Sequence, residues 1–321
     1  MIRRIAIAAV VVLVAGTAGV VAGLKWLRDG AGAAERPDIA FAPLADESIE
    51  DPDNPTKVFR VDLARVEHEV PLSRADLTRL TPENLLTLSQ EEIDQVYGRL
   101  TAGPIPDGPY QGDLFFARGE SLRTRLEEIL GGIEGRLAGA KIELLEAVAR
   151  SLWKGKMFYR DERVLRNFIE DFEPLRPLLD DPSSVMTATV PRRGRLGRLL
   201  PTTSVWLLFP AKLYCGQSLL DTRRESVIID YLYNDEIQGY RASPDSLAGR
   251  GGLHLRDEIR MIRPGLYLGR AYANRAFLLN FVLYNPEIAD AGGEAFAAGE
   301  PVAEDCWPGE QLRLQAVSVT Q

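Results

Sequence analysis

The sequence has few of the residues that most enzymes use for chemistry. It contains two histidines, His68 and His254, and no Gly-x-Ser-x-Gly elbow that would present a nucleophilic serine. Both histidines lie among charged or Gly-rich neighbours, which predicts exposed side chains. The chain also has two cysteines and no Cys-x-x-Cys pair, so the ligands of a structural zinc site are missing. We therefore predict no catalytic residue, no metal and no cofactor, and we favour a protein that is not an enzyme while leaving an enzyme as the last of three alternatives.

Positive charge is also scarce. The chain has 38 Lys and Arg against 46 Asp and Glu, which gives a formal net charge of −8 at pH 7. The first 34 residues carry four basic side chains and one acidic, which leaves 34 basic and 45 acidic side chains after them, a net charge of −11. An acidic surface repels phosphate, so the composition predicts no nucleic-acid partner.

The N-terminus contains the one long apolar run of the sequence. Residues Ile5 to Leu24 carry no charge over twenty positions, enough for a helix to cross about 30 Å of hydrocarbon. Trp26 follows the run and suits the membrane interface. We expect a single-pass anchor in the cell inner membrane, with the C-terminal part in the periplasm. Signal cleavage after the small residues Ala31 to Ala33 is the alternative.

The two cysteines, Cys215 and Cys306, are far apart in the sequence. An even pair of cysteines outside the cytosol predicts a disulfide. Two buried, inert thiols are the alternative.

The rest of the chain predicts an α+β protein. The segment Thr81-Pro82-Glu83 has the pattern of a helix start, and Ser89 with Glu92 forms a capping box. The expected parts are a membrane anchor at 1–28, a linker at 29–57, a helical segment at 58–102, an antiparallel β domain at 103–285 with a long inserted helix at 120–151, and an irregular tail at 286–321.

The β domain is predicted from short runs of β-branched and aromatic residues that Gly, Pro, Asn and Asp separate. Because no helical pattern alternates with these runs, they favour an antiparallel barrel or a strongly curved sheet over a parallel one. The nine candidate strands begin at Leu152, Val185, Thr203, Ala211, Glu225, Glu236, Asp257, Leu266 and Ala276. Tight turns are expected at Pro264-Gly265 and Ala273-Asn274.

Two short motifs carry a family resemblance. The segment from Gly108 to Gly112 has the form Gly-x-aromatic-x-Gly, and Trp153 to Phe158 has the form Trp-x-Gly-Lys-x-Phe. In this order they resemble the Gly-x-Trp-x-Gly element of lipocalin-like (calycin) bacterial β-barrel proteins, with Tyr110 where that element has Trp. The resemblance covers about half of the chain.

The resemblance implies a barrel of eight to ten strands that holds one hydrophobic ligand. The side chains then expected inside are Trp153, Phe158, Trp206, Tyr214, Tyr267 and Tyr272. Arg260 or Arg270 would meet a carboxylate head group if either turns inward. Alternatively, the aromatic residues simply fill the core.

Three functions follow in order of expectation. The first is a membrane-anchored periplasmic module that binds or carries a lipid or another hydrophobic small molecule. The second is a non-catalytic accessory subunit that docks on a membrane protein complex, with a filled barrel. The third is an enzyme that acts on an envelope lipid or glycan.

Overall fold

The computed structural model describes residues 34–44, 49–51, 54–59, 61–115, 153–170, 176, 179, 181–191 and 202–310. The chain divides after Arg36, and the second unit, Pro37–Gln321, carries every element described below. None of the helices in these ranges has the length and apolarity needed to cross a membrane. The expected anchor at 1–28 and the expected helix at 120–151 both lie outside the described residues.

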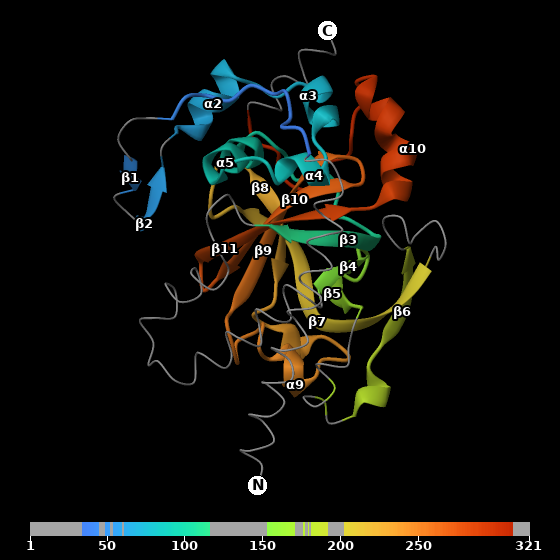
Figure 1. Ribbon diagram of the computed structural model, residues 1–321. Helices are drawn as coiled ribbons and strands as arrows, with labels where there is room; N and C mark the ends of the chain where they lie inside the picture. The colour runs from blue at the N-terminus through green and yellow to red at the C-terminus, as the bar shows by residue number, and fades with distance from the viewer. Residues whose placement is uncertain are drawn as a thin grey trace. The chain divides into compact units, whose positions relative to one another are not determined.

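An antiparallel β-barrel forms the centre of this unit (Figure 1). The sheet has the order β5-β4-β3-β11-β10-β9-β8-β7-β6, and β5 also pairs with β7, so that eight strands close on themselves and β6 extends the sheet from β7. The strands are β3 Gly108–Phe115, β4 Trp153–Tyr159, β5 Val164–Ile169, β6 Thr187–Pro191, β7 Thr202–Gln217, β8 Glu225–Asp230, β9 Leu255–Arg263, β10 Leu266–Ala273 and β11 Ala276–Tyr284. The sequence prediction of an antiparallel barrel is confirmed.

The long strand β7 closes the barrel because it changes partner along its length. It pairs with β6 up to Trp206, with β5 from Trp206 to Lys212, and with β8 from Lys212 onward. Phe209 has φ 49° and is skipped in the register with β5, so β7 bends at a bulge there. Pro210 is tolerated beside the bulge. The sequence predicted two strands on either side of Pro210, and this was wrong because a bulge, not a turn, accommodates the proline.

Four short helices cover part of the outer face of the barrel. They are α2 Leu63–Glu69, α3 Arg74–Arg79, α4 Pro82–Leu85 and α5 Gln90–Gly98, and Figure 1 shows them grouped together. Asp62, Ser73, Thr81 and Ser89 cap their N-termini through side-chain oxygens, as the sequence predicted for the last two. Their apolar side chains pack on outward-facing residues of β9, β10 and β11, including Ile262, Leu268 and Val282.

Other segments differ from the sequence prediction. The expected irregular tail begins with a helix, α10 Pro286–Ala297, which Asn285 caps by accepting a hydrogen bond from Ile288 N through Oδ1. Part of the expected linker forms the hairpin β1 Ile49–Asp51 and β2 Asn54–Phe59. The expected strand from Glu236 is absent, because that region folds as the short helices η4 Asn234–Glu236 and α9 Ala242–Asp245 with turns between them. The strand β5 was not predicted, and η3 Pro182–Ser184 precedes β6.

The predicted disulfide between Cys215 and Cys306 is present. It joins β7 to the segment that follows α10. Glu304 and Asp305 of that segment accept hydrogen bonds from Gly103 N and Ile105 N, each at 2.8 Å. This segment is therefore held against the residues that lead into β3.

Candidate functional site

The candidate site is a group of polar side chains inside the barrel, which we call the interior polar cluster: Lys156, Asn167, Tyr231 and Asp257. Strand alternation turns Lys156 and Phe158 of β4 to the same face, and Asp257 shares its face with Ile259 of β9. Phe158 and Ile259 belong to the barrel core. The cluster therefore lies among apolar side chains.

The ammonium of Lys156 is the centre of this cluster. It donates to Asp257 Oδ2 at 2.9 Å, to Asn167 Oδ1 at 2.9 Å and to the Tyr231 hydroxyl at 2.7 Å. A lysine ammonium has three N–H donors, so all of them are used within the protein. Lys156 therefore has no donor left for a ligand carboxylate.

Burial controls the electrostatics of the cluster. The side chains of Lys156 and Asp257 are only 3% and 9% exposed. Burial lowers the pKa of Lys156, and the neighbouring carboxylate of Asp257 opposes that effect. Burial also raises the pKa of Tyr231, and the charge of Asp257 adds to the increase. A phenol with a raised pKa stays protonated at neutral pH, so Tyr231 serves as a hydrogen-bonding group and not as a base.

Aromatic rings enclose the cluster. Trp153 Nε1 donates to Asn167 Oδ1 at 2.8 Å, and the Trp153 ring meets Phe281 edge to face at 6.0 Å between centroids. Lys156 Nζ lies 5.4 Å from the ring centroids of Trp153, Tyr231 and Phe281. These contacts favour the cation, since a ring face attracts positive charge.

Two glycines bring these rings close to the backbone. A Cβ atom at Gly112 would lie 2.1 Å from the Trp153 ring, and one at Gly269 would lie 2.2 Å from the Phe281 ring. No side chain larger than hydrogen fits at either position without a shift of the ring. The rings thus pack directly on the backbone of β3 and β10.

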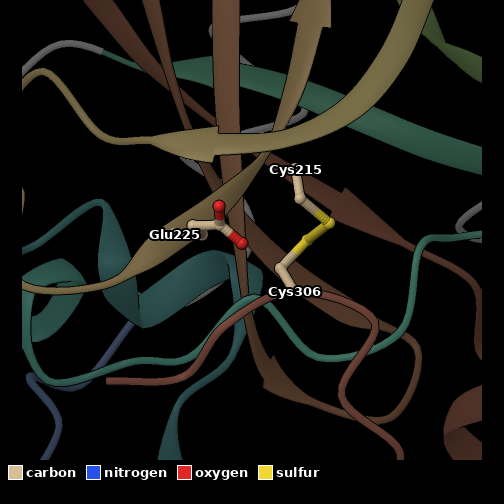
Figure 2. Close-up of side chains that lie close together, drawn as sticks. All are labelled: Cys215, Glu225 and Cys306. Carbon is tan, nitrogen blue, oxygen red and sulfur yellow. A yellow bond between two sulfur atoms is a disulfide. The ribbon is translucent and has the colours of Figure 1, made fainter. Parts of the chain in front are cut away.

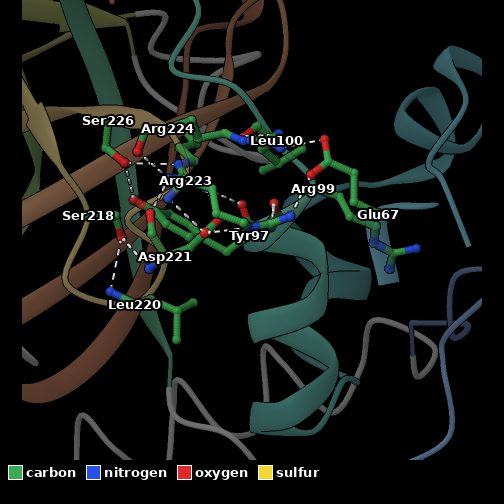
Figure 3. A network of polar contacts seen from close by, with 12 residues as sticks. Glu67, Tyr97, Arg99, Leu100, Ser218, Leu220, Asp221, Arg223, Arg224 and Ser226 are labelled. Carbon is green, nitrogen blue, oxygen red and sulfur yellow. Dashed lines mark hydrogen bonds and ion pairs between the residues drawn. The ribbon is translucent and has the colours of Figure 1, made fainter. Parts of the chain in front are cut away.

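A second polar group lies between the barrel and α5, and we call it the arginine layer: Asp221, Arg223, Arg224 and Arg260. Figure 3 shows the first three beside Tyr97 of α5. Arg260 is fully buried and uses all five of its N–H donors on Tyr97 O, Asp221 Oδ2, Asp221 O, Arg224 O and Ser226 Oγ, at 2.9 to 3.2 Å. Burial raises the pKa of Asp221, but the hydrogen bond from Arg223 and the charges of Arg260 and Arg223 outweigh it, so that the net shift is downward. This layer attaches the helices to the barrel.

The residues that the sequence placed inside the barrel fall into three groups. Phe158 and Tyr267 belong to the interior core, and Trp153 and Trp206 pack against it. Tyr267 contacts Tyr110 edge to face at 5.7 Å and donates its hydroxyl to Pro104 O at 2.7 Å. These four residues lie where they were expected.

The other four predicted residues do not lie in the interior core. Arg270 pairs with Asp94 of α5 and donates through Nε to the Tyr272 hydroxyl at 2.9 Å, so both belong to the helix-covered outer face. Arg260 lies in the arginine layer on the same face. Tyr214 is 38% exposed. Arg260 or Arg270 was expected to meet a ligand carboxylate only if it turned inward, and neither does, because their charged groups contact acidic and carbonyl partners beside α5.

The interior polar cluster was missed by the sequence reasoning, although a signal was present. Lys156 stands two residues before Phe158, which was expected to face inward, and Asp257 opens one of the expected strands. Strand alternation alone would have turned Lys156 inward. A buried lysine requires an acidic partner, and this requirement would have pointed to a carboxylate on another inward face.

A third group of side chains has the composition of a metal site. Cys215, Glu225 and Cys306 have ligand atoms that all lie within 4.8 Å of one another. Figure 2 shows the two sulfur atoms joined in the disulfide with the Glu225 carboxylate beside them. His68 and His254 are exposed, as the sequence predicted.

In comparisons with known proteins, no family model, no curated protein and no solved structure matches this chain.

Proposed function

We propose that the protein is a non-catalytic accessory subunit that docks on a membrane protein complex through the outer surface of a filled barrel. The uncharged run from Ile5 to Leu24 supports an anchor in the inner membrane, with the barrel in the periplasm. The disulfide supports an oxidising compartment.

The observation that carries this proposal is the state of the barrel interior. All three N–H groups of the Lys156 ammonium donate to acceptors inside the barrel, and the rings of Trp153 and Phe281 pack directly on glycine backbone. A lipid carrier instead needs an apolar cavity of a few hundred cubic ångströms. An interior whose polar groups satisfy one another favours a rigid scaffold over a container.

Two exposed tyrosines supply a docking surface. Tyr214 and Tyr233 are 38% and 44% exposed. Lys212 shares a face of β7 with Tyr214, and its Nζ lies 5.7 Å from the Tyr233 ring centroid. The Tyr214 hydroxyl donates to Asp230 Oδ2 at 2.7 Å. Tyrosine is enriched in protein interfaces, and rings already held in place lose little entropy on binding.

Native mass spectrometry of the full-length protein, released gently from membranes, tests this proposal. We expect a complex with a partner protein in fixed stoichiometry and no bound lipid. A one-to-one lipid adduct on the isolated chain would contradict it and would restore the carrier function that the sequence first favoured.

Matched variants locate the surface. Tyr233→Ala should weaken the complex by about 30-fold, the effect of removing an interface residue worth about 2 kcal/mol. Leu86→Ala is the control, because Leu86 is 45% exposed and lies in the turn that follows α4. Equal effects of the two substitutions would refute the tyrosine surface.

A further inference from the structure

The cluster of Cys215, Glu225 and Cys306 has a chemistry that neither the barrel nor its docking surface uses. Two thiolates and a carboxylate are ligands that zinc accepts, and their ligand atoms already lie within 4.8 Å of one another. Cys306 is buried, whereas Cys215 and Glu225 are partly exposed. An ion can therefore reach the group from solvent.

The cysteines would stay together without their covalent bond. Glu225 N donates to Trp307 O at 3.0 Å, and Trp307 N donates to Glu225 Oε2 at 2.8 Å. These two hydrogen bonds join β8 to the residue next to Cys306. The second one also orients the carboxylate, as hydrogen bonds to metal-binding carboxylates commonly do.

A separate set of hydrogen bonds holds the same segment to the residues before β3. Gly103 N donates to Glu304 Oε2 and Ile105 N donates to Asp305 Oδ2, both at 2.8 Å. Asp305 N donates to Gly103 O at 3.3 Å. None of these bonds involves a sulfur atom, so we expect them to hold the thiols beside Glu225 after the disulfide is cleaved.

We propose that Cys215, Cys306 and Glu225 form a zinc site when the disulfide is reduced. A dithiol reductant transfers two electrons and two protons to the sulfur atoms, the S–S bond breaks, and the dithiol becomes a disulfide. Zn²⁺ then replaces the thiol protons, which are released to solvent. The three side chains leave the fourth tetrahedral position to water.

The set of two sulfur ligands and one oxygen ligand determines which metal ion the site prefers. Thiolates favour zinc over magnesium or calcium, which take oxygen ligands. The disulfide and the metal exclude each other, since the same sulfur atoms form both. The segment that carries Cys306 is thus fastened to β7 in both redox states, by a covalent bond in one and by zinc in the other.

The test uses the full-length protein reduced with a phosphine, which takes an oxygen atom from water as the disulfide opens and leaves no thiol to compete for metal. Co²⁺ is added as the spectroscopic probe. We expect one equivalent to bind with a sulfur-to-cobalt charge-transfer band, and Zn²⁺ to abolish that band by displacement. The oxidised protein should show no such band.

Variants identify the ligands. Glu225→Gln keeps an oxygen acceptor for Trp307 N but removes the charge, and it should weaken Co²⁺ binding at least about tenfold. Glu236→Gln, at an exposed carboxylate of η4, should bind as tightly as the unchanged protein. The near-ultraviolet circular dichroism of the reduced protein reports whether it stays folded.

Three results would each overturn the proposal. They are the absence of the sulfur band in the reduced protein, unchanged affinity in Glu225→Gln, and loss of the near-ultraviolet signal on reduction, because the site depends on the folded segment. None of them bears on the docking function, which rests on the tyrosine surface and on the internally paired interior polar cluster.

Discussion

Removing the ammonium of Lys156 should be one of the most damaging single changes in the barrel. Lys156→Met leaves the aliphatic volume nearly unchanged but removes the positive charge that faces Asp257. The Asp257 carboxylate, only 9% exposed, would then be buried without its ion-pair partner. Breaking a buried ion pair in this way costs about 3–5 kcal/mol. In a unit of this size the melting temperature should fall by roughly 6–20 °C.

The double variant Lys156→Met with Asp257→Leu separates the charge from the packing. Asn167 Nδ2 still donates to the Tyr231 hydroxyl at 3.0 Å and to Phe209 O at 2.9 Å, so the remaining polar groups keep partners. Replacing a whole buried ion pair by apolar groups is often neutral or stabilising. We expect the double variant to recover at least about 2 kcal/mol relative to the single one.

Urea unfolding followed by circular dichroism and by tryptophan fluorescence measures both effects. The two probes should give the same transition, which justifies a free energy from a two-state fit. If Lys156→Met lowers the free energy of unfolding by less than about 1 kcal/mol, the effect is well below the range for a broken buried ion pair. The ammonium would then not be the essential partner of a buried carboxylate. A double variant less stable than the single one would refute the reasoning as well.

Three further predictions concern packing, pH and the disulfide. Gly269→Ala should lower the free energy of unfolding by about 1–3 kcal/mol, measured in urea, because its Cβ would meet the Phe281 ring; a neutral result would contradict the close packing. The pKa of Asp221 is lowered in the folded state, so its stabilisation is present above the unfolded pKa and is lost as the pH falls through the folded pKa. Asp221→Asn should accordingly lower the free energy of unfolding by about 3–5 kcal/mol at pH 7, because Arg260 loses its carboxylate partner. Below pH ~4 the stability of the variant should fall less steeply with pH than that of the unchanged protein. Equal acid profiles of the two proteins would argue against a lowered pKa of Asp221. Cys215→Ser should lower the free energy of unfolding by about 4 kcal/mol, since the disulfide closes a loop with a sequence separation of 91. Thiol alkylation without reductant should label this variant but not the unchanged protein.

Local patterns were sufficient for the elements that depend on local physics. The caps at Thr81 and Ser89 form from side chains three residues away from the groups they bind, so the sequence shows both partners. The strands β8, β10 and β11 follow runs of apolar and β-branched residues and begin at the predicted residues Glu225, Leu266 and Ala276. The disulfide was predicted from the number of cysteines and the expected compartment. Ligand binding by the eight residues that the sequence assigned to a ligand site stays a prediction.

Contacts between segments far apart in the sequence decided the closure of the barrel and the orientation of its buried polar side chains. Closure of the barrel depends on the bend of β7 at Phe209, within the stretch that pairs with β5. No local pattern marks this bulge, which a distant carboxylate, Asp245, stabilises by accepting from Phe209 N at 2.7 Å. The same holds for the orientation of Arg260, which is fixed by acceptors on α5, on β8 and in the segment between β7 and β8.

The sequence by itself determined the negative net charge, the antiparallel strands and the pair of cysteines, because each of these follows from composition or from side chains close together in the chain. The membrane anchor stays a prediction. Only the tertiary structure decided what the barrel contains. Lys156 and Asp257 are 101 residues apart and meet because β4 and β9 face each other across the interior. A buried charge is stable only beside its partner, and the fold alone brings the two together.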